Sequence, residues 1–162
     1  MLSVRKASPS DFALVMDIYK IARDFMSKTG NPNQWKNSRP TEEQIGKDIE
    51  NGICHVIFDK EGIHGVFALC EGVDSTYLYI EDGAWLDDAP YVTIHRIASD
   101  QKVHGILKCA MEYCQQYADS IRIDTHNKNA VMQHVLLKNG FKKCGIIYLK
   151  TGEPRIAFQW KK

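Results

Sequence analysis

The sequence predicts a mixed α/β (α+β) fold, in which one mixed sheet carries helices on it. Three observations lead to this class. Segments with the alternation and composition of strands concentrate in the middle and at the end of the chain. Segments with helical spacing stand between them, which gives the order β-αα-βββ-α-β-α-ββ. Two pairs of strand-like segments flank the short turns DKEG and KTGE and are therefore predicted to form hairpins.

The chain is predicted to begin with a short strand at residues 2–6, followed by a long helix. The stretch SPSD at 8–11 supplies an N-cap serine, a proline at the first helical position and a carboxylate at the third. Apolar side chains then keep helical spacing up to Gly30, where the helix is predicted to end.

A loop and a second helix are predicted next. The loop at 31–40, NPNQWKNSRP, is polar and contains a lone tryptophan. Thr41 and Gln44 have the spacing of a capping box, which indicates that a helix begins there. Asn51-Gly52 is a typical helix end, so the second helix is predicted to stop there.

The middle of the chain is predicted to be mainly β-structure. Residues 54–58 and 63–70 form the first hairpin, and residues 76–80 form either a further strand or an ordered loop arm. Residues 91–98 form the next strand. A helix at 105–117 follows it, with apolar residues at helical spacing.

The C-terminal part is predicted to contain a strand, a helix and a final hairpin. The strand occupies residues 121–125, and the helix occupies residues 130–138. Asn139-Gly140 stops that helix. Residues 141–149 and 155–160 form the two strands of the hairpin.

Length and composition predict one globular domain over residues 1–162. Hydrophobic residues make up 44% of the chain and charged residues 25%, which is typical of a folded protein with a real core. The net charge of +1 favours neither nucleic acid nor an anionic membrane as a partner. The five cysteines are odd in number and lack CxxC spacing, the start MLSVRKASPSD has no apolar signal core, and no apolar run could span a bilayer. We therefore expect a reduced, cytoplasmic protein.

The stretch IHRIASDQKVHGIL at 94–107 joins a predicted strand to a predicted helix. A helix N-terminus has unpaired backbone N–H groups and a partial positive charge, so it can bind a phosphate at the end of a strand. Gly105 would let a ligand approach the backbone, and Lys102 would add a positive charge. Charge-assisted hydrogen bonds contribute roughly 1.5–3 kcal/mol each, so several amides could hold a diphosphate. The alternative is a solvated loop whose glycine only permits close packing.

This stretch, the run NAVMQHVLLKNGF at 129–141 and the closing hairpin resemble the GNAT superfamily of N-acetyltransferases, and the resemblance covers nearly the whole chain. It implies a mostly antiparallel central sheet of about six to seven strands flanked by about four helices. It also implies acetyl-coenzyme A as co-substrate. The family's (Q/R)xxGx(G/A) loop holds the coenzyme's pyrophosphate with backbone amides, and Lys102, Gly105 and Leu107 take its defined positions. The resemblance assigns the coenzyme to Ile97, Ala98, Lys102, Val103, His104, Gly105, Ile106 and Leu107.

The run at 129–141 resembles the family's NxxAxxLYxxxGF-like pattern. Asn129 falls on its asparagine, Met132 on its alanine and Gly140-Phe141 on its ending. The resemblance implies that Asn129 bonds the pantetheine arm of the coenzyme. His134, on the same predicted helix, faces either the coenzyme or solvent and is assigned to the coenzyme site.

In the reaction that the resemblance implies, an amine attacks a thioester. A lysine-like amine has a pKa near 10.4, so deprotonation at pH 7 costs about 4–5 kcal/mol and a base is useful. His95 is our first candidate, because it is predicted to alternate with Thr93 and Ile97 on one strand face beside the thioester. Leu136 falls where many members have the tyrosine that protonates the departing thiolate, so Tyr148 is the candidate acid. For both candidates the alternative is ordinary packing in the sheet.

The acceptor is predicted to be a small-molecule or peptide amine. Trp35, Glu81 and Trp85 lie in polar loops and are candidates for its binding site, because acidic groups beside an aromatic ring suit a cationic amine. The alternative is that these tryptophans cover the core and that EDGAWLDD is a solvated turn. The polar residues at 124–129 lack metal-ligand spacing, so no metal is predicted.

Two functions remain open on the sequence, beside the alternative of a domain of this shape that binds no coenzyme at all. The helix cap, His95 and Asn129 favour an acetyl-coenzyme A-dependent N-acetyltransferase. The leucine at the tyrosine position favours an acyl-coenzyme A binding or regulatory module with little turnover. The acceptor, acyl groups other than acetyl and a homodimer are left open.

Overall fold

The computed structural model describes residues 1–162 and contains seven strands and four α-helices in the predicted order. None of the helices combines the length and apolar character needed to cross a membrane. The strands are β1 (Ser3–Lys6), β2 (Cys54–Asp59), β3 (Gly62–Glu71), β4 (Val92–Ser99), β5 (Ser120–Thr125), β6 (Lys142–Tyr148) and β7 (Pro154–Lys161). The α-helices are α1 (Phe12–Lys28), α2 (Glu42–Glu50), α3 (Ile106–Cys114) and α4 (Ala130–Lys138), with short 3-10 helices η1 (Pro9–Asp11) and η2 (Ser75–Tyr77).

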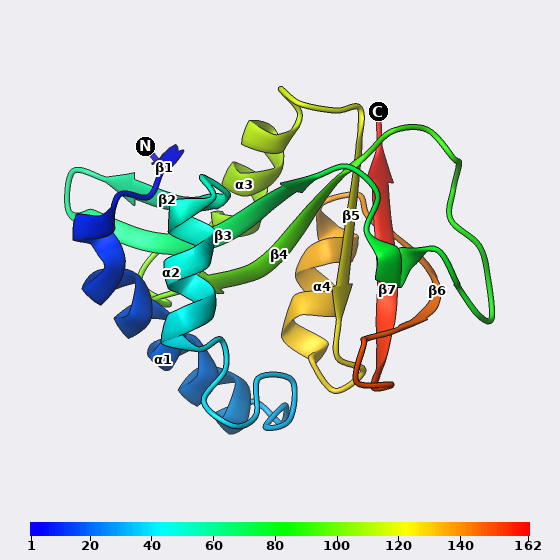
Figure 1. Cartoon of the computed structure of the whole chain (residues 1–162), viewed down its shortest axis with the longest axis horizontal. Helices are drawn as coiled ribbons and strands as arrows, with labels where there is room; N and C mark the ends of the chain where they lie inside the picture. The colour runs from blue at the N-terminus through cyan, green and yellow to red at the C-terminus, as the bar shows by residue number, and fades with distance from the viewer.

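The strands form one sheet in the order β1-β2-β3-β4-β5-β7-β6 (Figure 1). Every neighbouring pair is antiparallel except β4 and β5, which run parallel. This confirms the predicted mixed, mostly antiparallel sheet with four helices.

The parallel pair β4 and β5 is joined over a short length only. Val92 pairs with Ile121 and Thr93 pairs with Arg122, although both strands continue for several residues beyond these pairs. Figure 1 shows the two strands diverging from there. The sheet therefore opens in its middle, with β1–β4 on one side and β5–β7 on the other.

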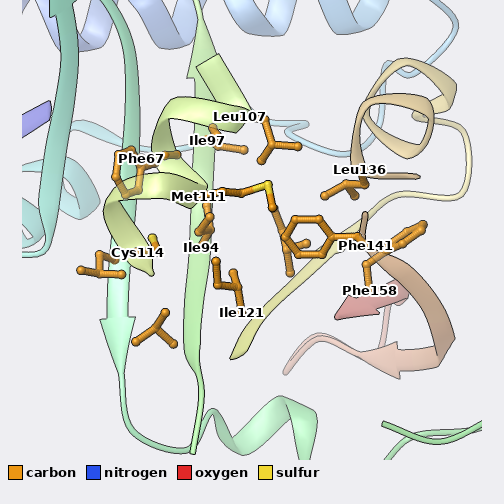
Figure 2. Close-up of a cluster of buried hydrophobic side chains, with 14 of the residues drawn as sticks. Phe67, Ile94, Ile97, Leu107, Met111, Cys114, Ile121, Leu136, Phe141 and Phe158 are labelled. Atoms are coloured by element: carbon orange, nitrogen blue, oxygen red, sulfur yellow. The ribbon is translucent and has the colours of Figure 1, made fainter. Parts of the chain in front are cut away.

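The helices lie on both faces of the sheet. Alternate residues of one strand point to opposite faces, and Val56 packs with the α1 and α2 cluster whereas Ile57 packs with the α3 cluster. Helices α1 and α2 thus cover one face, and α3 and α4 cover the other. Figure 2 shows side chains of α3 (Leu107, Met111, Cys114) meeting those of the sheet and of α4 in the larger core cluster.

The segment predicted as a strand or loop arm at 76–80 is not a strand. Residues Ser75–Tyr77 form the short helix η2, and an irregular loop follows. The Asp74 carboxylate accepts a hydrogen bond from the Thr76 N–H at 2.9 Å, which caps the turn and withdraws that N–H from any strand ladder. Tyr77 is buried beneath this loop.

The helix predicted at 105–117 is shorter at both ends. Gly105 has a φ of 86° and serves as the N-cap of α3, so the helix itself begins at Ile106. At the other end the Tyr117 N–H bonds the Cys114 carbonyl at 2.9 Å, a tighter turn than the α-helix.

A bulge in β4 overturns the predicted alternation along that strand. Arg96 has a φ of 51°, and the register with β3 shifts between Val66 and Ala68. The extra residue puts Ile97 on the same face as Ile94, in the larger core cluster, whereas His95 points to the opposite face. His95 and Ile97 were predicted to share a face, and they do not.

Candidate active site

Two neighbouring cavities lie beside β4, and the first of them lies where β4 and β5 separate. The first has a volume of about 510 Å³, and both diverging strands contribute to it, β4 through residues 94–97 and β5 through residues 123–125. Its other lining residues come from α1, the loop before α2, α2 itself, α4 and the last hairpin: Met26, Gln34, Trp35, Arg39, Pro40, Thr41, Gln44, Met132, Leu149 and Arg155.

The second cavity, of about 200 Å³, lies between α1, the turn that joins β4 to α3, and α4. Eleven of its 16 lining residues are hydrophobic, so it suits a largely apolar chain. Eight of the residues assigned to the coenzyme line it: Ile97, Ala98, Val103, His104, Gly105, Ile106, Leu107 and Asn129.

The two cavities meet in the opening of the sheet. Met26, Ile97 and Met132 line both of them. A ligand in the second cavity can therefore present a reactive group to a ligand in the first at these three residues.

The turn before α3 offers unpaired backbone N–H groups. The N–H groups of Val103, His104 and Gly105 donate no hydrogen bond within the chain, and the first amides of a helix have no intrahelical acceptor. Gly105 adopts the left-handed conformation that glycine favours, and the space around its Cα is open. These donors and the positive end of α3 fit an anion such as a diphosphate.

A buried histidine fixes the start of this turn. Nδ1 of His64 lies 2.9 Å from the Asp100 carboxylate, and its Nε2 lies 2.9 Å from the Asp59 carboxylate. The hydrogen bond with Asp100 is the main cause that raises the pKa of His64 above its ordinary value. Asp100 also accepts the N–H of Lys102 at 2.9 Å, so His64 and the amide turn share one carboxylate.

Two residues assigned to the coenzyme lie outside both cavities. Lys102 is exposed in the turn that Asp100 organises. His134 is exposed on α4, because Val131 and Val135, which are one helical turn apart, form the face that lines the second cavity.

The two leucines at family-pattern positions point into the core. Leu107 is 4% exposed and Leu136 is fully buried, and both belong to the cluster drawn in Figure 2. Since the side chain of Leu107 is turned inward, its bulk does not cover the amide turn. A hydrocarbon side chain at position 136 cannot transfer a proton.

Asn129 is engaged at both ends of its side-chain amide. Its oxygen accepts the Met132 N–H at 3.0 Å and caps α4, and its nitrogen donates to the Gln34 side chain at 2.9 Å. The same Gln34 oxygen accepts a bond from the Thr125 hydroxyl at 3.2 Å. Gln34 thus ties the loop before α2 to β5 and to the start of α4.

His95 lines the first cavity and forms a pair with a carboxylate. Its Nε2 lies 2.7 Å from Asp74 Oδ2, and a carboxylate only accepts, so Nε2 carries a proton, and in the neutral imidazole Nδ1 is the acceptor. The hydrogen bond from His95 is the main cause that holds the pKa of Asp74 well below its usual range. This arrangement orients an imidazole as a base.

A second carboxylate of this region is buried. The Tyr77 hydroxyl donates to Asp124 Oδ2 at 2.7 Å, and the Tyr77 ring lies 6.2 Å from the His95 ring. Burial raises the pKa of Asp124 above its usual value and that of Tyr77 well above its own. Asp124 therefore holds its negative charge less readily than an exposed aspartate.

The predicted acceptor residues are divided between two places. Trp35 lines the first cavity and meets the Tyr19 ring edge-on at 5.6 Å. Trp85 lines neither cavity, because it packs on Tyr77 at 5.1 Å and under the Arg122 guanidinium, 4.1 Å from its ring.

Glu81 and Tyr148 also lie away from both cavities. Glu81 pairs with Ile146 of β6 through an isolated bridge and accepts the Tyr79 hydroxyl at 3.3 Å. Its carboxylate raises the pKa of the nearby Tyr148. The structure does not bring Tyr148 together with His95 in one cavity.

Several residues of the first cavity were not predicted from the sequence, among them Gln34, Arg39, Arg96 and Arg155, and neither was Asp74, which pairs with His95. No local sequence pattern predicts these residues, because they come from separate segments of the chain. Gln34 stands beside Trp35 in NPNQW, which was the one available signal.

Comparisons with known proteins place this architecture among acyltransferases. No protein-family model and no curated protein matches the sequence. A GNAT-family acetyltransferase from Streptococcus agalactiae 2603 is 32% identical, with a TM-score of 0.89 over 99% of this chain and 95% of that one. The chain belongs to the GNAT family of acetyltransferases.

More distant structures share the fold. A GNAT-family acetyltransferase from Bacillus cereus ATCC 10987 is 24% identical, with a TM-score of 0.64 over 100% of this chain and 98% of that one. AAC(6')-Ib, solved in complex with ribostamycin and coenzyme A, is 15% identical, with a TM-score of 0.68 over 99% of this chain and 93% of that one.

Proposed function

We propose that the protein is an N-acetyltransferase that moves an acetyl group from acetyl-coenzyme A to a primary amine. One observation carries the proposal: two cavities meet at Met26, Ile97 and Met132, one beside unpaired amides and the other beside the His95–Asp74 pair. An acyltransferase needs such a division, because donor and acceptor must enter separately and meet at one point.

The second cavity and the turn before α3 fit the coenzyme. The unpaired N–H groups from Val103 to Gly105 suit its diphosphate, and the apolar walls suit its pantetheine arm. When bound, acetyl-coenzyme A supplies the activated thioester. Asn129 supports this site by capping α4, and its amide nitrogen has a second N–H that can bond the pantetheine arm.

His95 acts as the base in this proposal. An amine with a pKa near 10.4 is almost fully protonated at pH 7 and cannot attack in that form. Nδ1 of His95 takes the proton, directly or through one water, while Asp74 keeps the ring oriented and stabilises the imidazolium.

The departing thiol needs less assistance than the amine, because a thiol has a pKa near 8.5. The buried Leu136 cannot protonate it, so water in the opening serves as the proton source. The same leucine favours the second candidate, an acyl-coenzyme A binding module with little turnover.

A thiol-release assay with acetyl-coenzyme A and a panel of primary amines tests the proposal, alongside calorimetric titration of the coenzyme. We expect coenzyme binding and amine-dependent release of thiol. Binding without release for any amine would support the binding module instead. No binding would contradict both.

A further inference from the structure

The first cavity has an excess of positive charge. Its lining contains the arginines Arg39, Arg96 and Arg155, whereas Asp124 is its only carboxylate. That carboxylate is bonded to Tyr77, and its burial opposes ionisation. A cavity built for a simple cationic amine would have the opposite balance.

Arg155 is a buried cation whose carboxylate partner, Glu153, is distant and is shared with Lys36. It is 6% exposed, and its guanidinium donates to two backbone carbonyls, those of Pro154 at 2.9 Å and Gln34 at 3.3 Å. The Glu153 carboxylate is 4.0 Å away and is already paired with Lys36. Burying a charge that is only partly compensated is costly, and a bound anion would reduce that cost.

The other two arginines differ in how much of their charge is free. Arg39 is exposed, and its side chain forms no hydrogen bond or ion pair within the chain. Arg96 binds the Asp48 carboxylate through Nε at 2.8 Å and Nη2 at 3.1 Å, so its charge is largely neutralised. The positive charge of the cavity therefore comes from Arg39, which has no partner, and from Arg155, which is only partly compensated by Glu153.

We propose that the acceptor is a small amine that also carries a carboxylate, as an amino acid does. This inference rests on the proposed function. Arg155, with Arg39, binds the carboxylate, and the amine points to His95. Met26, Trp35 and Leu149 form an apolar wall of the cavity, which suits a medium-sized side chain on the acceptor.

Matched amines test the proposal with the intact protein. Free amino acids are compared with their methyl esters and amides, which keep the amine and lose the negative charge. We expect kcat/KM for acetylation to be about 10- to 100-fold higher for the free acids. The amide also mimics a peptide N-terminus, so equal rates for acid and amide would point to a peptide acceptor and overturn the inference.

Variants locate the effect. Arg155→Gln and, separately, Arg39→Gln should raise KM for the free acid and leave KM for the ester unchanged. Arg155→Lys should retain part of the preference, because it keeps the charge without the planar fork. Lys60→Gln is the control, because it removes one charge at a side chain that is 90% exposed in the turn between β2 and β3. It should leave KM unchanged for both the free acid and the ester. If the substitution of the buried Arg155 impairs folding, the exposed Arg39→Gln variant still tests the inference.

Binding separates this inference from the proposed function. Free amino acids are titrated calorimetrically into protein saturated with coenzyme A. Binding that Arg155→Gln abolishes, without thiol release, would contradict the transferase and support the carboxylate site. If carboxylate-bearing amines neither bind nor react, or if Arg155→Gln leaves their KM unchanged, the inference is overturned.

Discussion

The two cavities at the opening of the sheet are built in different ways. The second is formed mainly by one continuous stretch, residues 97–107, completed by α1 and α4. The first is assembled from side chains of segments as distant as Met26 and Arg155. Recognition by backbone amides is encoded locally, because a turn and a helix start suffice for it. Recognition by side chains depends on the tertiary fold, and it can differ between proteins that share one coenzyme site.

The largest expected effect lies in the first cavity. His95→Ala should lower kcat by about 10²–10⁴-fold, the usual range for loss of a general base. Coenzyme affinity should change little, because His95 does not line the second cavity. Steady-state kinetics and calorimetry of the same preparation measure both quantities.

Asp74→Asn is the matched variant for this effect. It keeps the shape of the side chain but offers an amide where Nε2 of His95 now meets a carboxylate. It should lower kcat in the same direction, though less than His95→Ala. Near-native kcat in both variants would remove His95 from the mechanism.

Ligand binding in the second cavity should raise the thermal stability of the protein. A ligand that binds only the folded state at a hundredfold excess over its Kd stabilises it by about 2.7 kcal/mol. For a chain of this size that corresponds to a rise in Tm of roughly 5–10 °C. Acetyl-coenzyme A should produce this shift in a thermal melt, whereas acetate or adenine alone should not. An unchanged Tm at millimolar coenzyme would contradict both candidate functions.

A substitution in the amide turn should reduce that shift. Gly105→Asp places a Cβ and a carboxylate beside the amides, at a φ of 86° that strains any other residue. Coenzyme affinity should fall at least about tenfold, or 1.4 kcal/mol. Gly152→Asp is the control, because Gly152 has a φ of 87° and equally open surroundings in the last hairpin. Equal affinities for the two variants would exclude the turn from the site.

The sequence predicted the fold and eight of the 16 residues that line the second cavity. Helix caps such as Thr41, with its bond from the Gln44 N–H at 3.1 Å, are local signals and were found. The bulge at Arg96 was missed, because the Tyr19 hydroxyl that bonds its carbonyl at 2.7 Å comes from a remote helix. For the same reason, only one residue of the His95–Asp74 pair, His95, was predicted from the sequence. Imidazole is conspicuous in a strand, but its partner lies 21 residues away.

The pH dependence of coenzyme binding sharpens the comparison further. Both ring nitrogens of His64 face carboxylates, and only the imidazolium can donate to both. Its pKa is raised in the folded protein. Such a group stabilises the fold fully below its unfolded pKa near 6.5, and this contribution is lost as pH rises through the raised value.

Loss of the proton should loosen Asp100 and therefore the amide turn. We expect coenzyme affinity to fall a few-fold as the pH rises from about 6.5 through the raised pKa of His64 in the native protein. In the His64→Gln variant, coenzyme affinity should depend less on pH. Any ionisation of the coenzyme itself affects both proteins equally, so it does not contribute to the difference. Calorimetric titrations across this range measure the difference. Parallel curves for the two proteins would show that His64 does not act on the turn.

The smallest effect is expected at Tyr148, outside both cavities. If Tyr148 protonates the departing thiol, Tyr148→Phe should lower kcat on the alkaline side of the pH–rate profile. Its position beside Glu81 argues against that role, because the carboxylate raises the pKa of Tyr148 and makes it a weaker acid. We therefore expect kcat to change less than about twofold at any pH. A larger alkaline loss, with unchanged coenzyme affinity, would mean that Tyr148 reaches the reacting atoms, and the opening of the sheet would then extend to β6.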